Sequence, residues 1–321
     1  MADASARSAR RDSSPRLWLH LLLLVLTFLT TTMVGMRYAY NFSFGRPPIT
    51  TETDIFPFPW VIHHLAYFGN GLPFSLSLLA IVLSHEFGHY FSCMRHGAKA
   101  SLPYLLPAPT LSGTAGAVIR LNSRIRSRMA LLDIGISGPI CGYLAAVPLT
   151  ILGLLLSKPQ PPTTVPSLVQ FHAPLTVSLL RDLLAAYRSD MPPLVDMVPH
   201  PILVASWVGL FITSLNLIPA GQLDGGHILY AISPKRHANW TSGMILLLIL
   251  AGAVYWMGWL VWALVLMLPG MRHSIVPADP PPSQRQSALL GVAAAAIFLL
   301  TSAPEPFVGM SLMSMMQSVK W

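Results

Sequence analysis

One short motif in the chain combines residue types that bind metals. It reads His85-Glu86-Phe87-Gly88-His89, with a glutamate directly after the first of two histidines. On a helix, histidines four residues apart lie on the same face, so both imidazoles can bind one Zn²⁺. Glu86 lies beside them, where its carboxylate can accept a proton from a water molecule. The spacing therefore predicts a zinc site with hydrolytic chemistry.

The surroundings of this motif favour a functional site over a chance match. The chain has only three glutamates, which are Glu52, Glu86 and Glu305. Glu86 lies inside an apolar stretch at 72–92, where an ionised carboxylate is costly unless it serves a function. We therefore interpret the two histidines and the glutamate as a metal site.

A catalytic zinc usually has three protein ligands and one open position. Two carboxylates, Asp224 and Asp133, border apolar segments at the predicted membrane face of the motif. Asp224 follows Pro219 and precedes two glycines, which should break the helix and let the carboxylate turn inward. Asp133 lies near several arginines and is expected to pair with them or to lie at a helix end. Asp224 is the predicted third ligand, and His227 is expected to support the site instead of binding the metal.

The segment around Asp224 carries a second pattern, N-x-x-P-x-x-x-L-D-G, which starts at Asn216. Together with the earlier H-E-x-x-H, it resembles the site-2 protease family (peptidase family M50) of intramembrane zinc metalloproteases. The stretches 102–109, 113–121 and 133–139 are similar to the bacterial and plastid branch, which lacks a PDZ domain. The resemblance implies one Zn²⁺ per chain, bound by His85, His89 and Asp224.

The resemblance also implies the roles of other residues and the reaction. Glu86 would be the general base, and Asn216 would hold the substrate or the oxyanion. The substrates would be single-pass membrane proteins, cut within or near their transmembrane segments. Such a segment must unwind first, because a helix hides its carbonyls in its own hydrogen bonds. Residues 113–121 could form an edge strand that captures it, with Gly113, Thr114 and Gly116 as binding residues, or could be an ordinary loop.

The composition indicates a membrane protein. Hydrophobic residues make up 53% of the 321 residues and charged residues only 10%, whereas a soluble domain has about 25% charged residues. Two cysteines exclude a disulfide scaffold. The net charge of +8 is spread over short stretches between apolar runs, which is typical of cytoplasmic loops and not of a nucleic-acid-binding face. The expected surrounding partner is therefore a lipid bilayer, and no nucleic acid.

The apolar runs predict an all-α polytopic membrane protein with about six to seven transmembrane helices. The runs lie at 17–34, 72–92, 129–156, 201–219, 240–270 and 287–302. The fifth run is too long for one straight crossing, so it should be two short or kinked helices that break near Gly258. The fold would also include a membrane-embedded β-hairpin or re-entrant loop. Residues 157–199 are expected outside the membrane, with a short amphipathic helix at 175–187.

Three parts follow from this layout: a basic, disordered segment at 1–16, a metalloprotease domain at 17–305 and a tail at 306–321. No small-x-small cleavage site follows the first run, which favours a retained helix over a signal peptide. The basic N-terminus and the basic loop at 93–128 are expected in the cytoplasm, in an inner (plasma) membrane. The second and fourth runs then end at the same face, where their motifs can meet.

Two other functions fit parts of the pattern. A catalytically silent homologue would keep the scaffold and bind membrane clients without cutting them. A metal transporter would also bury histidines and carboxylates in its helices. It would not need a glutamate between the two histidines, and the chain shows no paired repeat. Cleavage and zinc-flux assays separate these functions.

Overall fold

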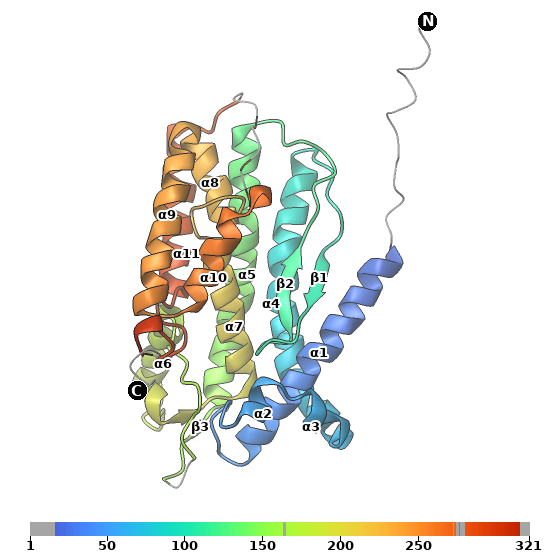
Figure 1. The fold of residues 1–321 in the computed structure, drawn as a ribbon, viewed down its shortest axis with the longest axis vertical. Coiled ribbons are helices and arrows are strands. Elements are labelled where there is room, and N and C mark those ends of the chain that lie inside the picture. Colours follow the sequence, from blue (N-terminus) through green and yellow to red (C-terminus); the bar gives the residue numbers. More distant parts are fainter. Residues whose placement is uncertain (1–16, 163–164, 272, 274–275, 277–279, 315–321) are drawn as a thin grey trace, which may run out of the picture.

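The computed structural model describes residues 17–162, 165–271, 273, 276 and 280–314. The predicted N-terminal segment 1–16 and the last residues of the predicted tail lie outside the described residues. The described chain is an elongated bundle of helices with two small two-stranded sheets, so the prediction of a helical polytopic membrane protein is confirmed (Figure 1).

Five helices of the described chain are long and apolar enough to cross a membrane. They are α1 (Leu17–Ser43), α4 (Phe68–Arg95), α5 (Arg128–Leu156), α9 (Pro234–Val254) and α11 (Gln284–Thr301). Two shorter apolar helices are α7 (Pro201–Asn216) and α10 (Gly258–Met267). The run at 240–270 is thus divided between α9 and α10, and the second helix begins at Gly258 as the sequence predicts.

The shorter helices lie between these spans. They are α2 (Glu52–Ile55), α3 (Phe58–Ile62), α6 (Leu175–Tyr187) and α8 (Asp224–Ile232), with 3-10 turns at Leu65–Tyr67, Leu194–Asp196 and Pro269–Met271. The amphipathic helix predicted at 175–187 is α6. The sequence did not predict α8, because Pro219 and the glycine pair indicate broken helix. The break is real but short, and a new helix begins at Asp224 itself.

A β-hairpin lies between α1 and α4, as Figure 1 shows. Its strands β1 (Tyr104–Pro107) and β2 (Thr114–Val118) are antiparallel, and Tyr104 faces Val118. Backbone hydrogen bonds continue the pairing beyond β2, from Ser101 N–H to the Arg120 carbonyl (2.9 Å) and from Asn122 N–H to the Lys99 carbonyl (2.7 Å). The second sheet pairs β3 (Lys158–Pro159) with β4 (Met197–Val198). It lies at the opposite end of the bundle from the open end of the hairpin.

Helix α1 holds the hairpin at both ends. The His20 ring nitrogen Nδ1 lies 3.1 Å from the carbonyl oxygen of Pro103. The Thr30 hydroxyl donates to the Gly113 carbonyl (2.6 Å), and the Tyr38 hydroxyl donates to the Leu111 carbonyl (2.6 Å). These contacts occupy the β1 side and the turn of the hairpin, while β2 faces the bundle.

A buried ion pair ties α1 to the loop that follows it. Arg37 on α1 pairs with Asp54 on α2, and both side chains are buried. The backbone amides of Thr50 and Thr51 also donate to Asp54, at 2.7 and 2.8 Å. Burial favours the neutral acid, but these hydrogen bonds and Arg37 lower the pKa of Asp54 below its ordinary value. The pair explains why α1 continues well past 34, through a charged residue.

Candidate metal centre

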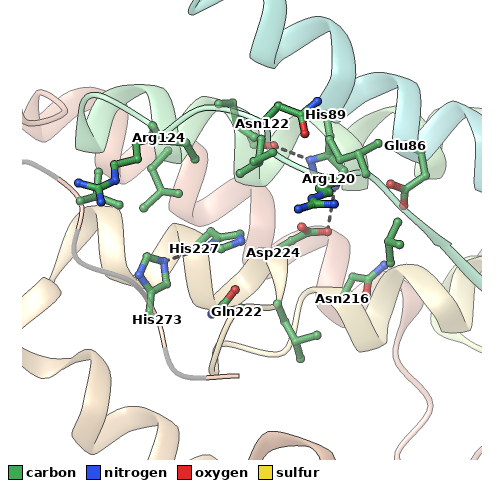
Figure 2. A pocket seen from close by; sticks show the side chains of 18 of the residues that line it. Glu86, His89, Arg120, Asn122, Arg124, Asn216, Gln222, Asp224, His227 and His273 are labelled. Carbon is green, nitrogen blue, oxygen red and sulfur yellow. Dashed lines mark hydrogen bonds and ion pairs between the residues drawn. The ribbon is translucent and has the colours of Figure 1, made fainter. Parts of the chain in front are cut away.

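Two helices bring the sequence-predicted residues together at one end of the bundle. His85, Glu86 and His89 lie on α4 a few residues before it ends, and Asp224 is the first residue of α8. Helix α7 ends at Asn216, and a short turn leads from it into α8. The side chains converge between α4, α5 and α8 (Figure 2).

Three ligand-type atoms form a nearly equilateral triangle. His85 Nε2 lies 3.1 Å from Asp224 Oδ2, His89 Nε2 lies 3.2 Å from the same oxygen, and the two Nε2 atoms are 3.2 Å apart. Tetrahedral zinc with bonds of about 2.0–2.1 Å sets its ligand atoms about 3.3 Å apart. Among the described residues, these three form a group of metal-ligating type. The donor set and its spacing therefore fit one Zn²⁺.

Hydrogen bonding fixes the orientation of His89. Its Nδ1 lies 2.7 Å from the carbonyl oxygen of Ile134 on α5, so Nδ1 carries the proton and Nε2 keeps a lone pair. The Nδ1 atom of His85 is buried and has no partner among the described residues. Both Nε2 atoms point at Asp224, so lone pairs and a carboxylate face one another, an arrangement that a cation stabilises.

Asp224 is a carboxylate in this site. Burial favours its protonated form, whereas a positive charge on His89 or His85, or a cation bound between the three side chains, favours the carboxylate and lowers the pKa of Asp224. Its position as the first residue of α8 adds the favourable field of a helix N-terminus. The three side chains therefore already have the arrangement that a bound cation requires.

Close packing of glycines places α8 and α5 against the site. A Cβ atom on Gly225 would lie 2.1 Å from the Leu217 carbonyl oxygen, and one on Gly226 would lie 2.5 Å from that of Ala220. A Cβ on Gly138 of α5 would lie 2.1 Å from His89 Nε2. No larger side chain fits at these positions without moving the backbone or the imidazole. The glycine pair after Asp224 is thus needed to fold the turn tightly onto the new helix.

Glu86 and Asn216 adjoin the triangle without being part of it. Glu86 is 5% exposed, and the backbone of Ile119, which follows β2, lies close enough to interact with its carboxylate. Asn216 Nδ2 lies 3.4 Å from His85 Nε2. The carboxylate is thus free of the metal ligands, as a general base must be, and an amide donor lies at the edge of the site.

The triangle opens into a cavity of about 1110 Å³. One wall is the segment 117–125, which comprises the end of β2 and the residues after it, and the opposite wall includes Gln222, Leu223 and His227. Gly113, Thr114 and Gly116 do not line this cavity. Gly113 lies at the hairpin turn, where its carbonyl accepts a hydrogen bond from Thr30. The residues of this segment that face the site follow Gly116, at 117–125.

The remaining polar residues near the site have other partners. Asp133 Oδ2 lies 2.9 Å from His96 Nε2, so its partner is a histidine and not one of the neighbouring arginines. His227 Nδ1 lies 2.9 Å from His273 Nε2, and both rings line the cavity (Figure 2). No local pattern connects His273 with the site, because it lies 46 residues further along the chain than His227.

The chain has relatives among known proteins. The family model of peptidase family M50 matches residues 73–251, which is more than half of the chain and includes His85, Glu86, His89, Asn216 and Asp224. The chain is 31% identical over 233 residues to "Probable zinc metalloprotease EGY1, chloroplastic" of Oryza sativa subsp. japonica, which covers 70% of this chain and 39% of that protein. The protein of the same name from Arabidopsis thaliana is 32% identical over 169 residues, or 51% of this chain and 30% of that protein.

A third relative extends the match along the chain. "Probable zinc metalloprotease EGY2, chloroplastic" of Arabidopsis thaliana is 26% identical over 245 residues, or 74% of this chain and 42% of that protein. The chain therefore spans less than half the length of these relatives. Two spaced motifs, their convergence at one end of a helical membrane bundle and the matched family model all agree, and the chain belongs to peptidase family M50.

Proposed function

We propose that the chain is an intramembrane zinc endopeptidase that hydrolyses peptide bonds within or near the transmembrane segments of other proteins. The observation that carries this proposal is the triangle of His85, His89 and Asp224 with Glu86 beside it, buried near the end of an apolar helix. Its similarity to the probable zinc metalloproteases named above supports it.

His85, His89 and Asp224 would hold the zinc ion. When bound, zinc lowers the pKa of water to about 7 and polarises a carbonyl oxygen. Glu86 accepts the proton of the attacking water and later gives a proton to the leaving amine. The Asn216 amide donates to the carbonyl oxygen as negative charge develops there. Burial keeps competing water away from Glu86 and strengthens these polar interactions.

The substrate would bind as an added strand. Within the described residues, β2 pairs with β1 on one side only, and its other edge faces the cavity. The Ile119 backbone reaches Glu86 from this edge, so a peptide paired here would pass directly over the site. Strand pairing supplies hydrogen bonds for a segment that has lost those of its helix, which is otherwise costly in lipid.

The site end of the bundle carries most of the basic loop residues, including Arg95, Lys99 and the arginines between 120 and 128. The positive-inside rule therefore supports a cytoplasmic position for this end and for the N-terminus. On this basis the protein would lie in a cell inner membrane, although the relatives named above carry the word chloroplastic.

A cleavage assay with a matched inactive variant tests the proposal. The purified full chain, loaded with Zn²⁺, is mixed in detergent with a single-span substrate that contains a Gly-Pro helix breaker. We expect cleavage by the wild type and a loss of at least about 10³-fold for Glu86→Gln, which keeps size but cannot accept a proton. A catalytically silent homologue would bind this substrate and leave it intact, and a transporter would move zinc across vesicles without cutting it.

A further inference from the structure

The wall of the cavity that follows β2 carries two cations that the proposed chemistry does not use. Arg120 and Arg124 line the cavity, and both are exposed at its mouth. The carboxylates that line it are Glu86 and Asp224, and both belong to the proposed metal site. Figure 2 shows Arg120, Asn122 and Arg124 in a row above Asp224 and His227.

These two guanidinium groups have no carboxylate partner among the described residues. The acids near this face are already engaged, since Asp133 contacts His96 and Asp224 contacts the two site histidines. The other arginine–aspartate pairs of the described chain belong to α1, α6 and the loop after α6. The mouth of the cavity therefore offers two positive charges to whatever enters it.

The backbone of this segment is held in place, so the positions of the two charges along a bound peptide can be stated. The Arg120 carbonyl accepts from Ser101 N–H (2.9 Å), and the Arg120 amide donates to the Ser101 hydroxyl (2.9 Å). Arg120 and Arg124 follow Ile119 by one and five residues. At about 3.3 Å per extended residue, Arg120 lies about 3 Å beyond the point where the chain reaches Glu86, and Arg124 lies further along, after the bend at 122–123.

We infer that Arg120 and Arg124 select substrates by charge. The preferred membrane segments carry acidic residues within about five positions of the cut bond. These acidic residues lie on the flank that leaves the membrane at the same end of the bundle as the site. This inference rests on the proposed protease function and names the substrate class. Most transmembrane segments carry lysine or arginine at their cytoplasmic end. The two arginines would repel such segments and attract the uncommon acidic ones. Specificity would then come both from binding the preferred substrates and from rejecting the basic ones.

An alternative role for the same charges is contact with anionic lipid headgroups at the membrane surface. That role would make cleavage depend on the lipid and not on the substrate flank. A position lining the catalytic cavity favours contact with the substrate, because a bound strand would lie between the two arginines and the headgroups. The experiment below separates the two roles.

The test uses three single-span substrates that share one apolar segment with a Gly-Pro breaker. They differ only in two residues placed three and four positions beyond the cut on the site-end side, which are Asp-Asp, Ser-Ser or Lys-Lys. The value of kcat/KM is measured for the zinc-loaded full chain in phosphatidylcholine vesicles and again with phosphatidylglycerol added. Cleavage of the Ser-Ser substrate reports on the proposed function itself, independently of charge selection.

The wild type should cut the Asp-Asp substrate about tenfold faster than the Lys-Lys substrate, since exposed charge pairs contribute modestly and add up. The double variant Arg120→Glu/Arg124→Glu should reverse this ratio, and Arg120→Gln/Arg124→Gln should bring it close to one. Arg126→Glu is the matched control, because Arg126 is an exposed neighbour that does not line the cavity, and its ratio should match the wild type.

Equal rates for the Asp-Asp and Lys-Lys substrates in the wild type would overturn the inference while leaving the protease function intact. A ratio that the two double variants do not change would also overturn it. A rate that follows the phosphatidylglycerol content and ignores the flank would assign the arginines to lipid binding. Failure of the wild type to cut any of the three substrates would instead count against the proposed function.

Discussion

His89 illustrates how single residues of the site are fixed before a metal binds. Its Nδ1 is committed to the Ile134 carbonyl at 2.7 Å, and Gly138 leaves room for its ring. The ring therefore cannot rotate freely, and its Nε2 must face Asp224 and His85. The preorganisation of all three ligand atoms means that metal binding should need little rearrangement.

Zinc content separates ligands from neighbours at the residue scale. Asp224→Ala should lower bound zinc to well below one per chain, as should His85→Ala and His89→Ala, because each removes one corner of the triangle. Asp133→Ala should keep full zinc, because that carboxylate contacts His96 and not the site. Metal per protein is measured by mass spectrometry on each purified variant. Full occupancy in Asp224→Ala, or loss in Asp133→Ala, would show that the carboxylate ligand has been wrongly assigned.

At the scale of elements, α8 depends on the turn that precedes it. The turn after α7 lies so close to α8 that Gly225 and Gly226 nearly touch the carbonyls of Leu217 and Ala220. Because Asp224 begins this helix, any shift of α8 also moves a ligand atom of the triangle. The helix thus links backbone packing directly to the metal site.

A single added methyl group tests this link. Gly226→Ala should push α8 away from Ala220, destabilise the fold by about 1–3 kcal/mol and weaken zinc binding. Gly243→Ala is the matched control, since a Cβ at Gly243 of α9 would meet no atom of the described residues within 4 Å outside its own stretch of helix. Thermal unfolding and zinc affinity are measured for both variants. Similar behaviour of the two would contradict the role given to α8.

The ion pair between α1 and α2 predicts a dependence of stability on pH. Because the pKa of Asp54 is lowered in the folded protein, its contribution is present above the unfolded value of about 4 and is lost as pH falls through the folded pKa. Asp54→Asn should lower stability at pH 7 by about 3 kcal/mol, since it leaves Arg37 buried without its partner.

The melting temperature of the wild type in detergent should therefore drop as the pH falls below about 5 and through the folded pKa of Asp54. The Asp54→Asn variant should start lower at pH 7 and lose less over the same interval. Parallel curves for the two proteins would mean that this carboxylate does not contribute to acid sensitivity.

The sequence predicted those elements that carry a strong local signal. The apolar runs, the helix at 175–187 and the break before Gly258 all follow from patterns within a few residues. It did not predict α8, because a glycine pair usually indicates a break in a helix. Here the two glycines are needed for close packing against Leu217 and Ala220, which only the structure shows. Likewise, the partners His96 of Asp133 and His273 of His227 come from other segments, so no local spacing could indicate them.

At the scale of the whole molecule, the site and the basic loops gather at one end of the bundle. The open end of the hairpin, α8, the end of α4 and the start of α5 meet there, while α2, α3 and β3 with its partner β4 lie toward the opposite end (Figure 1). This polarity predicts that a membrane separates the two sets of loops. The cavity then opens on the side to which the basic residues belong.

Cysteine labelling tests this polarity. In a background with Cys93 and Cys141 replaced by serine, single cysteines are introduced at the exposed positions Lys99, Lys235 and Ser189. In intact cells or sealed vesicles, a membrane-impermeant maleimide should label Lys99→Cys and Lys235→Cys from the same side and Ser189→Cys from the other. Labelling of all three from one side would contradict the proposed arrangement in the membrane.

The position of the cut in a defined substrate tests the central claim most directly. The zinc-loaded full chain is incubated with a single-span substrate, and both product termini are identified by mass spectrometry. We expect one main cut inside the apolar segment, near the end that faces the cavity. Glu86→Gln should give no products, and removal of zinc by a chelator should abolish cleavage until Zn²⁺ is added back. Cuts confined to the soluble flanks, or the same products from Glu86→Gln, would contradict the central claim.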